Sequence, residues 1–193
     1  AGCGGGFEIG RELPGCLSNA CRLVLDADAL NAVARDADLH DQLRARSERE
    51  KITILTPHPL EAARLLGTTA GAVQSDRLRA ARTLAAQTGA IVVLKGSGTI
   101  IATPDGRATI NSSGNARLAT AGTGDVLAGW IAGLWATQAH VLTPSHSIDV
   151  DNAKPAPVER LGAMDLALRI ALAAAFVHGL ACEADRDTRL PLI

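Results

Sequence analysis

The residues best suited to chemistry lie in one stretch of small and polar residues, 115–130, that leads into a helical pattern. It contains three turn residues and one carboxylate: Gly122, Thr123, Gly124 and Asp125. Glycines before a helix let backbone N–H groups point into one hollow, and the helix N-terminus adds partial positive charge. The stretch therefore predicts an anion site suited to phosphate.

Asp125 has two possible roles in such a site. A carboxylate would repel phosphate, so it is better suited to act as a base on a hydroxyl group that attacks phosphorus. The alternative is structural, because helix starts favour acidic residues as caps and in the first turn. This stretch alone leaves both interpretations open.

Two other groups of polar residues follow short apolar strands. Asp26 and Asp28 follow the run 22–25, and one group follows the run 91–94: Lys95, Gly96, Ser97, Gly98 and Thr99. Open α/β sheets bind ligands at the carboxyl ends of their strands, although either aspartate could simply cap the next helix. Lysine with glycines again indicates phosphate, but the pattern is not the GxxxxGK[ST] loop that runs into a helix.

His58 lies between Pro57 and Pro59, directly after the expected strand 52–55. Each proline restricts the residue before it to extended geometry, so the backbone of His58 is well defined. Its imidazole could donate to a ligand at this strand-to-helix junction. Without other information, a capping or surface histidine is the favoured alternative.

Composition and charge limit the classes of partner. The chain has 193 residues, enough for one domain with a sizeable core, and 47% of them are apolar. A formal net charge of −1 provides no basic field for nucleic acid or an anionic membrane. The longest uninterrupted apolar run, 170–177, is too short to span a bilayer, and no signal peptide is visible.

The cysteines do not form a metal-binding pattern. Cys3, Cys16, Cys21 and Cys182 include no CxxC pair and no histidine at ligand spacing, so we expect no zinc site and no metal held by a dedicated set of residues. Scattered cysteines indicate a reducing compartment, and we expect a cytoplasmic protein.

Strands that alternate with helical patterns predict an α/β layered fold with a largely parallel sheet. The expected strands are 22–25, 52–55 and 91–94, followed by a hairpin of 99–102 and 108–110. Helices are expected from Pro59, from Ser75, after Asp125 and over 162–184. The last is apolar nearly all round and should be buried.

Other segments give weaker expectations. Residues 36–51 are strongly charged and predict a solvated helix or loop, and 137–160 predict a mobile loop. Residues 1–6 are interpreted as a flexible terminus, with a loop against a ligand as the alternative. Gly129 and Gly133 each cost about 1 kcal/mol in a helix, so we expect them to pack closely against a neighbouring backbone.

Four motifs, in this order and spacing, resemble the ADP/ATP-dependent NAD(P)H-hydrate dehydratases, a branch of the ribokinase-like superfamily. They are Leu25–Asn31, Leu55–Pro59, Val93–Thr99 and Asn115–Asp125. The resemblance runs from about Val24 to Ala136 and includes His178 and Gly179. It implies a ribokinase-like αβα fold, here incomplete, with residues 1–193 forming a single domain that corresponds to the C-terminal portion of the family domain.

The resemblance also implies a function. Such enzymes repair NADHX and NADPHX, the hydrated forms of NADH and NADPH, by phosphorylating the ring hydroxyl with ADP or ATP and then losing phosphate. Bacterial-type members use ADP and yield AMP. Mg²⁺ is expected to bridge phosphate oxygens with few protein ligands. An epimerase, fused or separate, is an implied partner, and association into a homo-oligomer would cover an open sheet edge.

Residue roles carry over by position. Nucleotide binding falls to six residues: Lys95, Gly96, Ser97, Gly98, Thr99 and Gly124. The transferring phosphoryl group falls to Gly122, Thr123 and Gly124. Contacts with the hydrated cofactor fall to His58, Asp125 and Gly4, and Asp125 would take the proton from the attacking hydroxyl.

The chain also departs from the family pattern. It lacks the first strands that family members carry, so it resembles a fragment or a truncated gene product. Residues 1–6 would correspond to the family's Gly-Pro-Gly-Leu-Gly loop, with Cys3 and Gly5 in place of Pro and Leu. Leu60 stands where glycine is usual, which would crowd the pocket near His58.

Two alternative functions remain open. One is a small-molecule kinase of the same superfamily, of the hydroxyethylthiazole or sugar type, which should lack the sequence Thr56-Pro57-His58-Pro59. The other is a nucleotide-binding remnant without catalysis, which the missing strands suggest.

Overall fold

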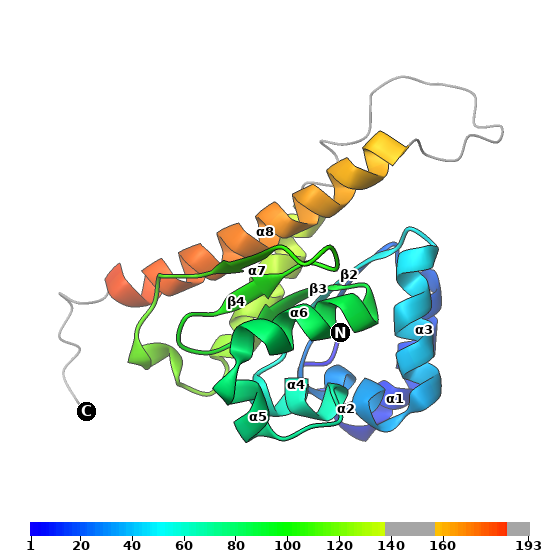
Figure 1. The fold of residues 1–193 in the computed structure, drawn as a ribbon, viewed down its shortest axis with the longest axis horizontal. Helices are drawn as coiled ribbons and strands as arrows, with labels where there is room; N and C mark the ends of the chain where they lie inside the picture. The colour runs from blue at the N-terminus through cyan, green and yellow to red at the C-terminus, as the bar shows by residue number, and fades with distance from the viewer. Residues whose placement is uncertain (138–156, 185–193) are drawn as a thin grey trace.

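The computed structural model describes residues 1–137 and 157–184, with one five-stranded sheet (Figure 1). The strands follow chain order across the sheet: β1 (Arg22–Leu25), β2 (Ile52–Leu55), β3 (Ile91–Leu94), β4 (Ile100–Ala102) and β5 (Ala108–Ile110). The first three pair in parallel, and β3, β4 and β5 pair antiparallel. The predicted α/β fold, with its parallel strands and following hairpin, is confirmed.

Alternation along β3 explains why this strand lies in the middle of the sheet. Val92 and Leu94 join the core on one face, and Ile91 and Val93 join the core on the other. Successive side chains of a strand point to opposite faces, so an unbroken apolar run suits a strand covered on both sides. Each face therefore needs a layer of helices.

One face is covered by the helices of the first half of the chain. They are α1 (Ile9–Asn19), α2 (Ala27–Arg35), α3 (Ala37–Glu48), α4 (Pro59–Leu65), α5 (Ala70–Ser75) and α6 (Arg77–Thr88), with the short η1 (Gly6–Glu8) before them. Their buried side chains and those of Leu25, Leu55 and Leu94 form one core cluster. The expected helix start at Ser75 is wrong, because Ser75 ends α5 and the Asp76 carboxylate caps α6 by accepting from the Arg79 amide.

The charged segment 36–51 is a helix, α3, that is not fully solvated. Leu39 and Leu43 are buried, and Arg46 is only 2% exposed. The Arg46 Nε donates to Thr53 Oγ1 at 2.8 Å and its Nη1 donates to the Leu17 carbonyl at 2.5 Å. A buried guanidinium is tolerated when its N–H groups have partners, and here it ties α1 and α3 to β2.

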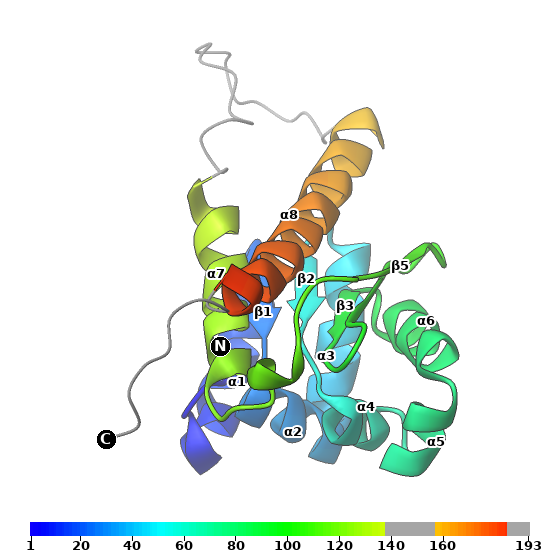
Figure 2. The ribbon, with the colours of Figure 1, turned by 90° about the vertical axis from the view of Figure 1, so that its left-hand side faces the viewer.

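The other face is covered by α7 (Thr123–Thr137) and α8 (Pro157–Ala184), which lie beside each other (Figure 2). α7 packs on β1, and α8 packs on β2, β3 and β4. The short η2 (Ala116–Leu118) precedes α7. Most of the expected loop 137–160 lies outside the described residues, although Thr137 ends α7 and α8 begins five residues before the predicted start at 162.

α8 is buried along one side only, so the expectation of full burial is wrong. Ala167, Ala171 and Ala174 face the sheet, whereas three large side chains are exposed: Phe176, Val177 and Leu180. By length and composition alone, Gly162–Glu183 could cross a membrane, with 22 residues and a mean hydropathy of 1.6. The apolar part of α8 is therefore longer than the run 170–177 indicated. Core helices of globular proteins have a similar composition, and α8 packs on the sheet.

α7 also leaves an apolar stripe uncovered. Leu127, Ile131 and Trp135 are buried, whereas Val126, Trp130 and Leu134 are exposed. Among the described residues, nothing lies within 4 Å of a Cβ added at Gly129 or Gly133. The expected close packing at these glycines is therefore wrong, because both lie on the uncovered side.

The first residues lie against the end of β1. The Ala1 amino group donates to the Val24 carbonyl at 2.6 Å, and the Asp26 amide donates to the Ala1 carbonyl at 3.0 Å. A Cβ on Gly2 would collide with the Asp26 carbonyl oxygen. The interpretation as a flexible terminus is therefore wrong, because this segment is hydrogen-bonded at the carboxyl edge of the sheet.

Candidate active site

Two glycine loops meet at one cavity. We call residues 95–99, between β3 and β4, the lysine loop, and residues 122–125, at the start of α7, the aspartate loop. A cavity of about 590 Å³ is lined by the whole lysine loop and by Thr123 and Gly124 of the aspartate loop. Residues 111–116 and His178 complete much of its wall. The two stretches singled out from the sequence are therefore brought together.

The lysine loop has a backbone that requires glycine. Gly96 has a φ of 144° and Gly98 a φ of 61°, values that residues with a Cβ rarely adopt. The Thr99 hydroxyl donates to the Gly96 carbonyl at 3.0 Å, and the Lys95 amide donates to the Pro57 carbonyl at 2.8 Å. The second bond joins this loop to the segment that contains His58.

The Lys95 side chain connects the two loops. Its Nζ lies 2.7 Å from Asp26 Oδ1, and a Cβ added to Gly124 would lie 3.1 Å from the same nitrogen. Asp26 is 1% exposed. It is the N-cap residue of α2 but makes no capping bond with its side chain, so its carboxylate serves Lys95 instead. The lysine charge is thereby placed at the start of α7.

The sequence placed Asp26 at the carboxyl end of a strand, with ligand binding or helix capping as its possible roles, but did not predict its pairing with Lys95. Asp26 follows β1 and Lys95 follows β3, with the end of β2 between them. The Lys95 side chain therefore extends past the end of β2 to reach Asp26. The next residue, Ala27, has a φ of 47°, which is strained for a residue with a Cβ. Strained backbone often accompanies a side chain that must be held in a particular direction.

The aspartate loop is held by local bonds. The Thr123 hydroxyl donates to the Leu118 carbonyl at 2.7 Å and to the Thr120 carbonyl at 2.8 Å. Gly122 has a φ of 88°, so the turn before α7 also requires glycine. The amides of Gly124 and Asp125 lie in the first turn, where a helix offers them no internal acceptor.

Asp125 itself is exposed and belongs to a small cluster with Asp26 and Cys3. Ligand atoms of these three residues lie within 4.8 Å of one another. Partial burial, a hydrogen bond with Asp125 and the charges of both aspartates raise the pKa of the Cys3 thiol to about 11. The thiol therefore stays protonated near neutral pH, and its Sγ lies 3.7 Å from Asp26 Oδ2.

The donor chemistry of this cluster fits Mg²⁺ only in part. Mg²⁺ prefers oxygen ligands, which Asp26 and Asp125 supply, whereas a protonated thiol is a poor ligand for it. Lys95 already occupies one oxygen of Asp26. The expectation of a Mg²⁺ ion held mainly by phosphate oxygens therefore stays a prediction.

His178 forms the wall of the cavity on α8. Its ring lies edge-on to Trp130 of α7, with centroids 6.5 Å apart. Burial lowers the pKa of His178, so the ring tends to stay neutral. A Cβ on the next residue, Gly179, would lie 2.1 Å from Ser113 Oγ, so only glycine lets the 111–116 segment pass this close to α8.

His58 and Gly4 do not line the cavity. His58 caps α4, because its Nδ1 accepts from the amides of Leu60 and Glu61 at 3.1 and 3.2 Å. This is the capping role that the sequence favoured. Leu60 is 46% exposed and, like His58, does not line the cavity, so the expected crowding near His58 stays a prediction. Gly4 has a φ of 66° in the turn beside Cys3, and its contact with substrate stays a prediction.

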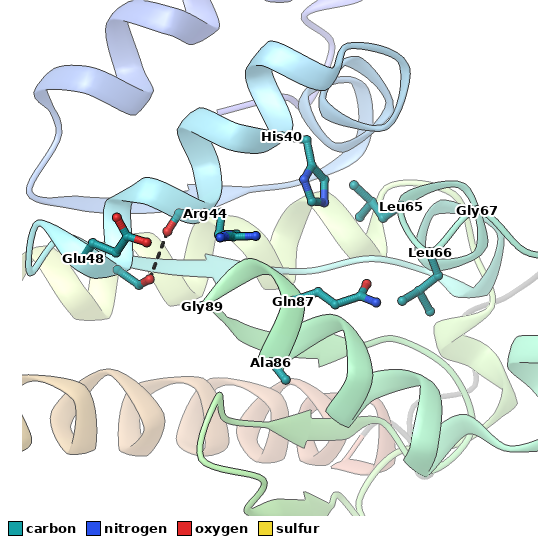
Figure 3. A pocket seen from close by; sticks show the side chains of 10 residues that line it. His40, Arg44, Glu48, Leu65, Leu66, Gly67, Ala86, Gln87 and Gly89 are labelled. Carbon is teal, nitrogen blue, oxygen red and sulfur yellow. Dashed lines mark hydrogen bonds between the residues drawn. The ribbon is translucent and has the colours of Figure 1, made fainter.

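A second hollow, of about 580 Å³, shares no lining residue with the cavity between the two loops (Figure 3). Side chains of His40, Arg44 and Glu48 on α3 face the ends of α4 and α6 across it. It contains none of the residues that the sequence selected. The cavity between the two loops is therefore the candidate site.

Comparisons with known proteins identify the family that this chain resembles. A sequence model described as NAD(P)H-hydrate dehydratase matches residues 9–188. An ADP-dependent (S)-NAD(P)H-hydrate dehydratase of Neisseria meningitidis serogroup B is 50% identical over 141 residues, 70% of this chain and 46% of that protein. A bifunctional NAD(P)H-hydrate repair enzyme of Moorella thermoacetica is 52% identical over 111 residues, 58% of this chain and 20% of that protein. The chain thus spans less than half the length of these relatives.

Solved structures are similar over most of this chain. An ADP/ATP-dependent NAD(P)H-hydrate dehydratase of Bacillus subtilis, co-crystallised with ATP and Mg²⁺, is 29% identical with a TM-score of 0.63, covering 94% of this chain and 53% of that one. A ribokinase-like superfamily protein of Enterococcus faecalis is 23% identical with a TM-score of 0.60, covering 95% of this chain and 53% of that one. The second likeness concerns the fold alone, and it supports the predicted ribokinase-like architecture.

The family match thus extends over nearly all described residues, from α1 through the two loops to α8. The resemblance inferred from the four motifs is confirmed. This chain belongs to the NAD(P)H-hydrate dehydratase family.

Proposed function

We propose that the protein containing this chain dehydrates NADHX and NADPHX to NADH and NADPH, with ADP as the phosphoryl donor. One observation carries the proposal: the Lys95 ammonium lies between Asp26 and the start of α7, next to the residue that precedes Asp125. A cation, a helix N-terminus and a carboxylate are thus assembled at one point. Phosphoryl transfer needs mostly positioning and charge stabilisation, which this assembly supplies.

The nucleotide occupies the cavity between the loops. A volume of about 590 Å³ is in the range of small-molecule sites. Lys95 to Thr99 and Gly124 contact the nucleotide, whose phosphates extend towards Lys95 and the first turn of α7. Backbone amides there favour negative charge, because the helix dipole places partial positive charge at this end.

Asp125 acts as the base in the first step. Its carboxylate takes the proton from the ring hydroxyl as the hydroxyl oxygen bonds to the terminal phosphorus of ADP. The bond from that phosphorus to the bridging oxygen breaks, and AMP leaves. Gly122 to Gly124 hold the transferring group, and Lys95 offsets its negative charge.

In the second step, the oxygen of the former ring hydroxyl leaves the ring as part of phosphate. The carbon–oxygen bond of the phosphorylated ring breaks, and a neighbouring carbon loses a proton as the double bond forms. Lys95 and the start of α7 stabilise the departing phosphate. Mg²⁺, when bound, would neutralise phosphate charge, with Asp26 and Asp125 as its available protein ligands.

The hydrated cofactor approaches from the side of residues 1–6 and His58. Gly4 and His58 contact it in this proposal, and the bond between Lys95 and Pro57 fixes the His58 segment relative to the lysine loop. A cytoplasmic location, a fused or separate epimerase and assembly into a homo-oligomer remain predictions for the whole protein.

A second candidate function is nucleotide binding without turnover. It is favoured by the lining of the cavity, which includes the whole lysine loop but neither Asp125 nor His58. The small-molecule kinase is not proposed, because it should lack Thr56-Pro57-His58-Pro59, which this chain contains, and because the matching family model is that of the NAD(P)H-hydrate dehydratases.

Turnover of purified chain with NADHX, ADP and Mg²⁺ tests the proposal through the return of NADH absorbance. We expect Asp125→Asn to lower kcat by about 10²- to 10⁴-fold, the usual contribution of a general base. Asp38→Asn is the matched control, because Asp38 is also an exposed first-turn acid of a helix. Equal turnover by Asp125→Asn and parent would refute the base role, and ADP binding without NADH formation would favour the second candidate.

A further inference from the structure

Arg77 lies outside every motif discussed above, yet its side chain supports the lysine loop. It is the first residue of α6, and its guanidinium contacts backbone carbonyls of the loop. Nη1 donates to the Ser97 carbonyl, and Nη2 donates to the Leu94 carbonyl at 3.2 Å and the Lys95 carbonyl at 3.4 Å. One side chain therefore holds three backbone carbonyls, one at the end of β3 and two in the lysine loop.

This position is unfavourable for an arginine unless the loop compensates. A cation at the first turn of a helix opposes the helix dipole. The nearby Asp76 carboxylate bonds Arg79 rather than Arg77. Burial lowers the pKa of Arg77, and its Nε is buried with no hydrogen-bond partner among the described residues. The carbonyls of the loop are thus the groups that hold this cation here.

The guanidinium also packs directly against Gly96. A Cβ added to Gly96 would lie 2.9 Å from Nη2 and 3.2 Å from Cζ of Arg77. The loop therefore needs glycine at this position for two reasons, its φ of 144° and the closeness of the guanidinium. The lysine loop and Arg77 fit each other as one unit.

The direction of the carbonyls fixes the direction of the amides. In a trans peptide, the C=O of one residue and the N–H of the next point in opposite directions, and the described residues contain no cis peptide bond. The Lys95 and Ser97 carbonyls point to Arg77, so the amides of Gly96 and Gly98 point away from it. Within the described part of the chain these two amides donate no hydrogen bond, and both glycines line the cavity.

We propose that Arg77 is a positioning residue for the nucleotide. It turns two carbonyls away from the cavity and leaves the Gly96 and Gly98 amides directed into it, where they donate to oxygen atoms of a nucleoside diphosphate. This inference rests on the proposed nucleotide site. It assigns the preorganisation of that site to a residue that never touches the ligand.

The test compares Arg77→Ala, Arg77→Lys and the control Arg82→Ala. Arg82 lies on the same helix and is exposed. Calorimetry with ADP and Mg²⁺ should show the dissociation constant raised about tenfold or more in Arg77→Ala, since two hydrogen bonds to charged oxygens are weakened. Arg77→Lys should be intermediate, because an ammonium cannot reach three carbonyls in the geometry of the planar fork. Arg82→Ala should match the parent.

Two further readouts separate positioning from mere stability. Methylguanidinium added to Arg77→Ala should restore ADP affinity and leave the parent unchanged. In turnover assays the KM for ADP should rise while the KM for the hydrate stays constant. If Arg77→Ala does not fold, Arg77→Lys carries the measurements of ADP affinity and of the two KM values.

Three results would overturn the inference. The first is equal ADP affinity in parent and folded variants. The second is a loss of ADP affinity that methylguanidinium does not reverse and that accompanies an equal loss of hydrate affinity. The third is a parent chain that binds no ADP, which would also remove the nucleotide site that the inference requires.

Discussion

The lysine loop and the aspartate loop are alike in composition but are held in different ways. Carbonyls of the lysine loop bond Arg77, a residue of another helix, whereas Thr123 of the aspartate loop bonds carbonyls within five residues along the chain. The first conformation therefore depends on packing between α6 and the sheet. The second is a property of its own local sequence.

Lys95 links the two loops to a buried carboxylate, so it should be the most sensitive position. Lys95→Met leaves Asp26 buried without its cation and should lower the free energy of unfolding by about 3 kcal/mol. Urea denaturation measures this loss. The double variant Lys95→Met/Asp26→Asn should recover most of it, because the orphaned charge is gone. A single variant as stable as the parent would show that the pair does not join the loops.

The glycines of the two loops should differ in their tolerance of alanine. Both Gly96 and Gly122 have positive φ, which costs a residue with a Cβ about 1–2 kcal/mol. Only at Gly96 would the new Cβ also meet a side chain, 2.9 Å from Arg77 Nη2, whereas nothing lies within 4 Å at Gly122. We expect Gly96→Ala to unfold at lower urea concentration than Gly122→Ala. The reverse order would contradict the close fit with Arg77.

Local anchoring of the aspartate loop can be tested at Thr123. Thr123→Val removes a hydroxyl that bonds two carbonyls and should cost about 1 kcal/mol of unfolding free energy, whereas Thr123→Ser keeps the hydroxyl. Thermal denaturation of both variants separates the hydroxyl from the methyl group. Equal losses would mean that packing, rather than hydrogen bonding, holds the turn.

The smallest expected effect concerns pH. Burial holds the pKa of His178 below its ordinary value of 6.5, so the unfolded chain binds this proton first as the pH falls. The contribution of neutral His178 to the free energy of unfolding is complete above pH 6.5 and is lost as the pH falls through the lowered pKa. Denaturation at several pH values should show a shallower acid decline in His178→Gln. A pH profile of stability identical to that of the parent would show that His178 does not contribute to the acid decline.

The strands were well predicted because their signals are local. The bounds of β1, β2 and β3 agree with the short apolar runs, and Gly89 ends α6 with a left-handed φ of 65°. α1 was not predicted, since Gly10, Pro14 and Gly15 interrupt its pattern. The spacing of its buried residues, Leu13 and Leu17, was the signal that could have revealed it.

Burial was predicted less well, because it depends on neighbours. The composition of α8 indicated burial on all sides, yet Phe176, Val177 and Leu180 are exposed on the side that neither the sheet nor α7 covers. Arg46 has a sequence context of surface residues but lies inside, where the carbonyls of α1 and the Thr53 hydroxyl satisfy it. Whether a side chain is covered is a property of the elements around it.

The sequence by itself determined the parallel strands, the following hairpin, the two glycine loops and the membership of a family. These depend on side-chain type, backbone propensity and motif spacing, which are read along the chain. Only the tertiary structure decided that Lys95 pairs with Asp26, 69 residues away, and that Arg77 supports the lysine loop. Both contacts arise because neighbouring strands and helices bring distant residues to one edge of the sheet, and no local pattern records that distance.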